Sequence, residues 1–320
     1  MKKIALILGG LGQDGIEMSI FLKKKEYKII SLINKKNSNL KKINYKKIKY
    51  FFCKVEDTKK IILIIKKFKP LEIYNFSGIS TIAETEKNIL LNEKVNSTSF
   101  LKLLNALKKI KYKGKIFQSL SAEVYGDYNY QKININSEFN PSNPYAIAKL
   151  TSYYYARYFR NRFQLKIYCA FLYNHDSKYN KKKHLLHYIV NNFKKISSSK
   201  INNFVIKNIT SKRDWNLATD FVHKIWNVVQ TKKPCDFILR SGSYNTVEEI
   251  IFNTARFFKI PIVKLQNGNK VTFINAKTNK PIIYSSKYKE KLLIYKKKII
   301  DIKLIKKNKL LKIINNISNS

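Results

Sequence analysis

The sequence is poor in cysteine and in acidic residues, and it lacks long apolar runs. Its three cysteines, Cys53, Cys169 and Cys235, are widely spaced and form neither a metal-binding pattern nor a disulfide framework, so a reducing compartment is expected. No apolar run approaches the roughly 18 residues that a membrane span requires. The short apolar run near the start ends in glycines, without the cleavage site of a secretory signal. We therefore expect a soluble, cytoplasmic protein with no membrane partner.

The shortage of acidic residues leaves a formal net charge of +44, from 64 basic and 20 acidic side chains. Only six of the basic residues are arginines, whereas proteins that read nucleic acids rely on arginine to contact phosphates and base edges. The lysines are spread along the whole chain with abundant Asn and Ile, as a compositional bias of the encoding genome would produce. We interpret most of them as solvated surface and expect no specific nucleic-acid partner, although this charge gives some affinity for phosphate.

Strands and helices are expected to alternate regularly through the first half of the chain. With 320 residues, 44% of them hydrophobic, the chain can form a large domain with a smaller lobe. Short apolar runs alternate with amphipathic stretches, which indicates a parallel sheet covered by helices on both faces. The expected strands are 3–8, 27–33, 49–53, 71–76, 115–120 and 166–172, and the expected helices are 14–26, 58–68, 88–109 and 145–163.

A glycine-rich loop follows the first expected strand. Gly9, Gly12 and Gly15 have the spacing G-x-x-G-x-x-G, in the segment Gly9-Gly10-Leu11-Gly12-Gln13-Asp14-Gly15. Glycines allow the tight turn and let the backbone approach a pyrophosphate at the N-terminus of the next helix. A position between a strand and a helix is the context that a dinucleotide-binding motif requires, and this spacing is typical of short-chain dehydrogenases.

The glycine loop therefore specifies the fold class more closely. We predict an α/β fold, a Rossmann-type doubly wound parallel sheet with a smaller C-terminal substrate-binding lobe. Residues 1–173 would form the dinucleotide-binding domain and residues 174–320 mainly the lobe. A segment near 212–242 would return to the first domain.

The residues after the second strand favour NADP as the cofactor. An acidic residue there would bind the ribose 2′-hydroxyl of NAD, whereas a basic residue accommodates the 2′-phosphate of NADP. The chain has Asn34-Lys35-Lys36-Asn37-Ser38 at this place, with no acid.

A candidate catalytic group lies between residues 121 and 149. Tyr145 and Lys149 form a Y-x-x-x-K pair at the start of a helix, and their spacing puts both side chains on one face. The ammonium group of Lys149 would lower the pKa of the Tyr145 phenol and make it a base near neutral pH. Ser121 and Glu123 follow the strand 115–120, and in extended backbone they would point to the same side. A hydroxyl and a carboxylate at this edge of the sheet would face the ligand crevice.

Several segments resemble the GDP-mannose 4,6-dehydratase family, collinearly from Met1 to about Gly242. The segments that carry the resemblance are Gly12-Gln13-Asp14-Gly15, Lys69-Pro70-Leu71-Glu72-Ile73-Tyr74-Asn75, Phe139-Asn140-Pro141 with Pro144 to Lys149, Asn174-His175-Asp176-Ser177 and Lys212-Arg213-Asp214-Trp215. The resemblance implies that Tyr145 deprotonates the C4 hydroxyl while hydride leaves C4 for NADP⁺. Glu123 would then remove the C5 proton and help to expel the C6 hydroxyl as water, and hydride would return to C6. Ser121 stands where the family has a threonine that bonds the sugar.

The resemblance also implies the binding residues and an oligomer. Cofactor contacts would come from Gly9, Gly12, Gln13, Asp14, Gly15, Asn34, Lys35, Lys54, Val55, Phe76, Ser77, Ser80, Tyr145, Lys149 and His175. Substrate contacts would come from Asn174, Arg213 and Lys280. A homodimer or homotetramer is expected, with the loop from Lys35 to Ser38 reaching a neighbouring subunit. The helical run Tyr153-Tyr154-Tyr155 is interpreted as a core and interface face.

The chain departs from the family pattern at several positions that contact the nucleotides. Lys54 replaces an acidic residue, Ile79 a glutamine, and Lys280-Pro281 an Arg-Pro pair. Two other functions stay open: another nucleotide-sugar epimerase or decarboxylase, and a non-catalytic basic binding protein. His184, His187 and His223 have no further ligand at metal-binding spacing, so no metal site is expected.

Overall fold

The computed structural model describes residues 3–34, 48–126, 133–180, 184–286 and 316–318. The chain divides into two compact units. The first contains the residues up to Tyr173 and Ala218–Leu239, and the second contains Asn174–Leu217 and the described residues from Arg240 onward. Among the described residues, no helix combines the length and the apolar character that a membrane crossing requires.

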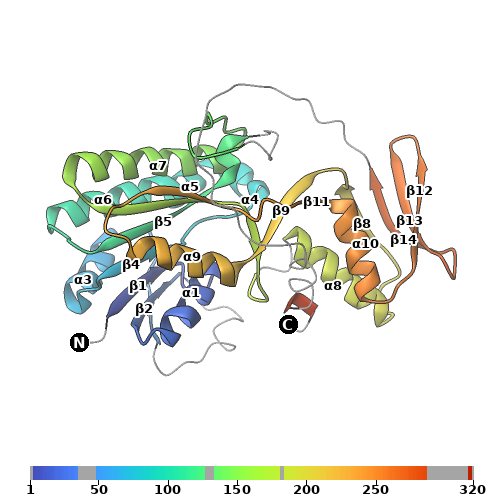
Figure 1. Ribbon diagram of the computed structural model, residues 1–320, viewed down its shortest axis with the longest axis horizontal. Coiled ribbons are helices and arrows are strands. Elements are labelled where there is room, and N and C mark those ends of the chain that lie inside the picture. The colour runs from blue at the N-terminus through green and yellow to red at the C-terminus, as the bar shows by residue number, and fades with distance from the viewer. Residues whose placement is uncertain (1–2, 35–47, 127–132, 181–183, 287–315, 319–320) are drawn as a thin grey trace. The chain divides into compact units, whose positions relative to one another are not determined.

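The first unit contains a seven-stranded sheet in which every neighbouring pair is parallel (Figure 1). Its strand order is β10-β6-β5-β4-β1-β2-β3. The bounds are β1 Ile4–Leu8, β2 Lys28–Ile33, β3 Ile48–Phe52, β4 Glu72–Asn75, β5 Lys115–Ser121, β6 Lys166–Leu172 and β10 Asp236–Leu239. The order reverses between β1 and β4, and ligands of such sheets bind at this point, beyond the carboxyl ends of the strands. The α/β, doubly wound fold expected from the sequence is confirmed.

Helices cover both faces of this sheet (Figure 1). On one face α1 (Gln13–Lys24) packs against α9 (Ala218–Gln230), and on the other α6 (Ser99–Lys109) packs against α3 (Thr58–Phe68) and α7 (Pro144–Phe163). Sheets that are covered twice need strands that are apolar on both sides, and the central strand β1 has four of its five residues buried.

The expected helix over 88–109 is confirmed, and it contains a π-helical turn that was not expected. It consists of α5 (Ile89–Glu93), the π-helical turn over Lys94–Thr98, and then α6, and a short helix α4 (Ile82–Lys87) precedes it. Asn88, at φ −148°, separates α4 from α5 and caps α5, because its side chain accepts a hydrogen bond from the Leu91 amide at 2.9 Å. Single π-helical turns inside helices occur frequently at functional sites.

The second unit is built from two small sheets and two longer helices. One sheet has the order β11-β9-β7, with β7 Asn174–Asp176, β9 Lys212–Leu217 and β11 Tyr244–Thr246. The other has the order β12-β13-β14-β8, with β8 Phe204–Asn208, β12 Ile262–Asn267, β13 Lys270–Asn275 and β14 Pro281–Ser286. The helices are α8 (Leu185–Ser197) and α10 (Val247–Phe257).

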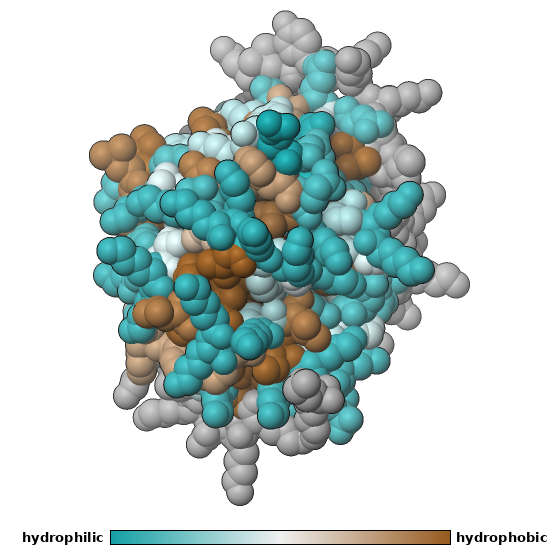
Figure 2. All heavy atoms as spheres, turned by 90° about the vertical axis from the view of Figure 1, so that its left-hand side faces the viewer, coloured by the Kyte–Doolittle hydropathy of each residue, from teal (hydrophilic) through white to brown (hydrophobic). Residues whose placement is uncertain are grey.

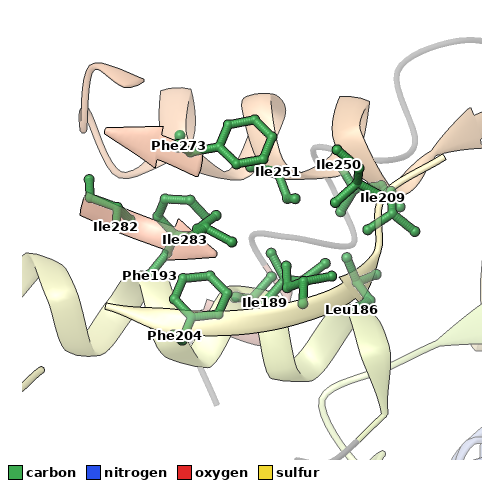
Figure 3. Close-up of a cluster of buried hydrophobic side chains, with 14 of the residues drawn as sticks. Leu186, Ile189, Phe193, Phe204, Ile209, Ile250, Ile251, Phe273, Ile282 and Ile283 are labelled. Atoms are coloured by element: carbon green, nitrogen blue, oxygen red, sulfur yellow. The ribbon is translucent and has the colours of Figure 1, made fainter. Parts of the chain in front are cut away.

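An apolar cluster forms the core of this second unit (Figure 3). Phe193 from α8, Phe204 from β8 and Phe273 from β13 point into it, together with Ile250 and Ile251 from α10. Each fully buried side chain of this size contributes roughly 1.5–3 kcal/mol of hydrophobic free energy. A buried cluster separate from the first unit explains how the second holds its shape.

The described lysines are mostly exposed, as expected for a solvated charged surface. Figure 2 shows one face of the molecule, on which hydrophilic side chains predominate and smaller hydrophobic patches lie between them.

Candidate active site

The glycine loop joins β1 to α1, and close backbone packing explains its composition. Gly9 has φ +78°, and a Cβ there would lie 2.8 Å from the Ser77 amide nitrogen. A Cβ at Gly15 would lie 2.4 Å from the Gly9 carbonyl oxygen. The Gly12 amide donates to the same carbonyl at 2.9 Å, which closes the turn. A side chain at Gly9 or Gly15 would therefore push neighbouring backbone apart and displace the turn. The turn places backbone amides at a helix N-terminus, where they can bind a pyrophosphate, so the loop fits a dinucleotide.

The other expected cofactor residues lie at the same edge of the sheet. Asn34 is exposed just after β2, and Lys54 (exposed) and Val55 (half-buried) follow β3. The Cys53 amide donates to the Ile33 carbonyl at 2.8 Å, which ties the ends of β2 and β3 together. Lys35, with the rest of the segment that favours NADP, lies outside the described residues.

The loop Phe76 to Ser80 leaves β4 and passes beside Lys149. A Cβ at Gly78 would lie 3.5 Å from Lys149 Nζ and 2.4 Å from Asn96 Oδ1. Asn96 fixes this loop through both sides of its amide. Its Oδ1 accepts from the Ile79 amide at 3.2 Å and its Nδ2 donates to the Ile79 carbonyl at 3.0 Å.

The buried network around Asn96 extends to helix α7, which carries Tyr145 and Lys149. Asn96 Nδ2 also donates to Asn92 Oδ1 at 2.7 Å, and Asn92 Nδ2 donates to the Pro144 carbonyl at 2.8 Å. The Ser152 hydroxyl donates to the Asn96 carbonyl at 2.6 Å. These three side chains are at most 2% exposed. These residues were not predicted from the sequence. The available signal was their spacing: Asn92 and Asn96 are four residues apart, and Ser152 follows Lys149 by three, so each pair lies on one face of a helix.

Ser121, Glu123 and Tyr145 meet where β5 ends and α7 begins. Ser121 is the last residue of β5, and the Glu123 amide donates to its hydroxyl at 3.2 Å. The chain turns into a 3₁₀ helix over Ala122–Tyr125, so the expectation that Ser121 and Glu123 share one side of extended backbone is wrong. A hydrogen bond nevertheless joins Ser121 to the Tyr145 hydroxyl.

Tyr145 lies in the first turn of α7. Asn143 caps the helix, because its side chain accepts from the Ala146 amide at 2.9 Å, and Pro144 occupies the first turn. The cap fixes where the helix begins and therefore where Tyr145 projects.

The pKa values of Tyr145 and Lys149 are both shifted toward the neutral forms. Burial raises the pKa of Tyr145, the bond to Ser121 acts in the opposite direction, and the carboxylates of Glu123 and Asp14 raise it further. Burial lowers the pKa of Lys149 to about 8, against a smaller raising effect of Asp14. Lys149 Nζ donates to the Ser119 carbonyl at 3.1 Å and lies 5.8 Å from the centre of the Tyr145 ring.

The ammonium group of Lys149 was expected to lower the pKa of Tyr145. In this structure it donates to the Ser119 carbonyl, and burial is the largest cause of the raised pKa of Tyr145. Additional positive charge beside the phenol would lower that pKa.

The expected residues of the second unit lie in two places. Asn174 (exposed) and His175 (half-buried) are in β7, which pairs with β9 so that Asn174 lies opposite Trp215. Arg213, half-buried in β9, donates to the Lys212 carbonyl at 2.7 Å. Lys280 is exposed in the turn before β14, in the other sheet of this unit, and no described hydrogen bond or ion pair joins it to Arg213.

Asp214 is a further residue of this unit that the sequence did not single out for a role. It is 1% exposed and accepts from the Ser241 amide and hydroxyl at 2.9 and 2.8 Å and from the Gly242 amide at 2.8 Å. Burial raises its pKa, and the bonds from Ser241 and Gly242 oppose this. Asp214 thereby fixes the turn that contains Gly242 at φ +75°, beside the strand that carries Arg213.

Comparison with known proteins identifies the family. A sequence model described as GDP-mannose 4,6 dehydratase matches residues 6–308. The GDP-mannose 4,6 dehydratase of Drosophila melanogaster is 26% identical over 262 residues, which cover 78% of this chain and 66% of that protein, just under two thirds of its length. The Homo sapiens protein of the same name is 28% identical over 263 residues, covering 78% of this chain and 71% of that protein.

Solved structures share the fold at lower identity. UDP-glucose 4-epimerase from Thermotoga maritima, solved with UDP-glucose, has a TM-score of 0.72 at 18% identity, over 80% of this chain and 82% of that one. dTDP-glucose 4,6-dehydratase from Bacillus anthracis, in complex with NAD, has a TM-score of 0.73 at 18% identity, over 90% and 86%. Because the family model spans nearly the whole chain, this chain belongs to the GDP-mannose 4,6-dehydratase family, whose members are NAD(P)-dependent nucleotide-sugar enzymes of the extended short-chain dehydrogenase/reductase type.

Proposed function

We propose that this chain is a nucleotide-sugar 4,6-dehydratase, a lyase that converts GDP-mannose to GDP-4-keto-6-deoxymannose. The observation that carries the proposal is the grouping of Ser121, Glu123, Tyr145 and Lys149 at the carboxyl edge of the parallel sheet. Substrate oxygens and a cofactor would meet these groups in the crevice where ligands of such folds bind.

NADP is the proposed cofactor. The glycine loop would hold its pyrophosphate, and the end of β2 carries Asn34 and no acid that would compete with a 2′-phosphate. When bound, NADP⁺ would supply the hydride acceptor and a delocalised positive charge. Ser77 and Ser80 offer further hydroxyl groups on the loop that Asn96 holds.

Tyr145 is the proposed acceptor of the proton from the C4 hydroxyl. Its phenolate needs added positive charge, because burial and two carboxylates raise its pKa in this structure. Ser121 donates a hydrogen bond to the phenolate oxygen and lowers that pKa, and the same hydroxyl group is available to a sugar oxygen. Lys149 stays fixed by the Ser119 carbonyl and adds charge below pH 8.

Glu123 is the proposed base that removes the C5 proton after C4 has become a ketone. The ketone makes this proton acidic, and departure of the C6 hydroxyl as water completes the elimination. Its influence on the pKa of Tyr145 indicates that the two groups work close together. An epimerase needs a proton acceptor at C4 but no second carboxylate for C5, so Glu123 favours the dehydratase over the epimerase alternative.

The apolar face of α5 and α7 supports a homodimer, which is the assembly that we propose. Leu90 on α5 is 84% exposed, and Ile147, Tyr154 and Tyr158 on α7 are 50–56% exposed at helical spacing. The two helices pack against each other. Covering such a patch with a second copy removes apolar area from water.

The dimer can be tested by sedimentation of the wild type and of Leu90→Glu with Tyr154→Glu. Dimers that become monomers in this variant support the assembly, and a monomeric wild type contradicts it. Tyr284→Glu is the matched control, because Tyr284 is 43% exposed in the other unit.

Turnover of GDP-mannose with NADP⁺ tests the proposed reaction. The 4-keto sugar should form with the wild type, and Glu123→Gln should reduce kcat by at least about 100-fold, as expected for a positioned general base. Glu26→Gln, at an exposed residue at the end of α1, is the matched control and should keep full activity. NADP⁺ binding without any product would overturn the proposal and lead to a screen of other nucleotide sugars.

A further inference from the structure

Within the described residues, the three-residue strand β7 has a ladder partner on one side. Its residues Asn174–Asp176 pair with β9, and the sheet order β11-β9-β7 makes β7 an edge strand. Short edge strands are weakly fixed, because half of their backbone groups have no ladder partner. A segment that is to present Asn174 and His175 to ligands therefore needs a second anchor.

That anchor comes from the first turns of α8. His187 is 2% exposed, and its Nε2 lies 2.8 Å from the Ser177 carbonyl oxygen, directly after β7. Because a carbonyl only accepts, this nitrogen carries the proton and donates. The same nitrogen lies 3.8 Å from the buried carboxylate of Asp176. Burial lowers the pKa of His187, and the bond to Ser177 acts in the opposite direction.

The turn after β7 closes around the same carbonyl. The Asn180 amide donates to the Ser177 carbonyl at 3.0 Å, and the Tyr179 amide donates to the Ser177 hydroxyl at 3.3 Å. The Asn180 side chain donates to Asp176. The imidazole thus binds a turn that is already closed and joins it to a helix of the second unit's core.

We infer that His187 is a positioning residue that fixes the segment Asn174 to Ser177 for ligand binding. Its ring bonds the backbone of this segment and does not bond the side chains of Asn174 and His175, which we expect to bind ligands. The inference rests on the proposed function in so far as these two residues bind ligands, whereas the tether itself can be tested without turnover.

The test compares His187→Leu, which removes the donor at similar volume, with His187→Gln, which offers an amide donor. Hydrogen exchange of the amides of residues 174–180 reports the tether directly. Exchange should accelerate roughly tenfold in His187→Leu, the effect of losing one net hydrogen bond. His187→Gln should stay near wild type. Asn192→Leu is the matched control, because Asn192 is buried on the same helix and its side chain donates to the Tyr188 carbonyl of its own helix.

Steady-state kinetics then link the tether to binding. KM for GDP-mannose should rise about tenfold in His187→Leu, with a smaller change in kcat, and His187→Gln should restore it. If His187→Leu does not fold, His187→Asn, whose shorter amide cannot span the same distance, takes its place.

The possible outcomes separate the inference from the proposed function. Unchanged exchange at 174–180 overturns the inference, and so does faster exchange with an unchanged KM. If the wild type does not turn over GDP-mannose, the proposed function fails. The tether is still supported if exchange at residues 174–180 is faster in His187→Leu and returns to the wild-type rate in His187→Gln.

Discussion

Replacing Lys149 by methionine should stabilise the protein at neutral pH while abolishing its activity. Lys149 is 4% exposed, and burial lowers the pKa of its ammonium group from 10.5 to about 8. At pH 7 the group is charged although the folded state disfavours its charge, and this lowers the free energy of unfolding. Methionine fills nearly the same volume without a charge.

The magnitude follows from the shift in pKa. The change from 10.5 to about 8 corresponds to about 3 kcal/mol at pH 7, at 1.36 kcal/mol per pKa unit. Removing Lys149 also removes its hydrogen bond to the Ser119 carbonyl, which contributes about 1 kcal/mol. The Lys149→Met variant should therefore be about 2 kcal/mol more stable than the wild type at pH 7.

The pH dependence has a definite sign. Because the pKa of Lys149 is lower in the folded state, the folded state binds fewer protons than the unfolded state between the two pKa values. The wild type is therefore most stable, as far as Lys149 is concerned, above pH 10.5, and it loses this stability as the pH falls through 8. Between pH 7 and pH 10 the free energy of unfolding of the wild type should thus rise by about 2 kcal/mol relative to that of the variant.

Urea unfolding of both proteins at pH 7 and pH 10, without added cofactor, measures these differences. Titration of all other groups cancels in the comparison of the two proteins. The reasoning would be refuted if Lys149→Met were less stable at pH 7 and the difference did not change with pH. A stable, inactive variant would show that Lys149 is kept for function at the expense of stability.

Three further perturbations test other parts of the site. Gly9→Ala places a Cβ 2.8 Å from the Ser77 amide at φ +78°, so NADP⁺ binding measured by calorimetry should weaken at least about tenfold; unchanged affinity would contradict the role of the loop. Asn96→Asp loses two donated hydrogen bonds, so the free energy of unfolding in urea should fall by about 2 kcal/mol and the KM for NADP⁺ should rise. Unchanged stability and unchanged KM would argue against the network. Asp214→Asn turns one of its acceptors into a donor that faces donors from Ser241 or Gly242, so a thermal melt should show destabilisation by about 2 kcal/mol, and an unchanged melting temperature would refute this account.

Local sequence signals were sufficient for the framework of the first unit. The helix Thr58–Phe68 and the strand Lys166–Leu172 have the bounds expected from their apolar patterns. The glycine loop was predictable because its conformation depends on residues within the loop and on its immediate neighbours. Such elements carry their own periodicity and their own turn residues.

The parts that sequence reasoning missed depend on contacts between distant segments. The π-helical turn lies where the Asn96 side chain bonds Ile79, 17 residues away, and where the Asn96 carbonyl accepts from Ser152, 56 residues away. The direction of the Tyr145 pKa shift depends on burial and on two carboxylates from other segments. No window of adjacent residues contains these partners, so periodicity alone could not predict the π-helical turn or the direction of this pKa shift.

The reaction itself is tested most directly with GDP-mannose that carries deuterium at C4 of the sugar. The proposed mechanism moves the hydride from C4 to C6 within one turnover, so the 4-keto-6-deoxy product should carry the deuterium at C6. Glu123→Gln should form almost none of this product. Sugar that retains deuterium at C4 with inverted configuration would establish an epimerase and contradict the account.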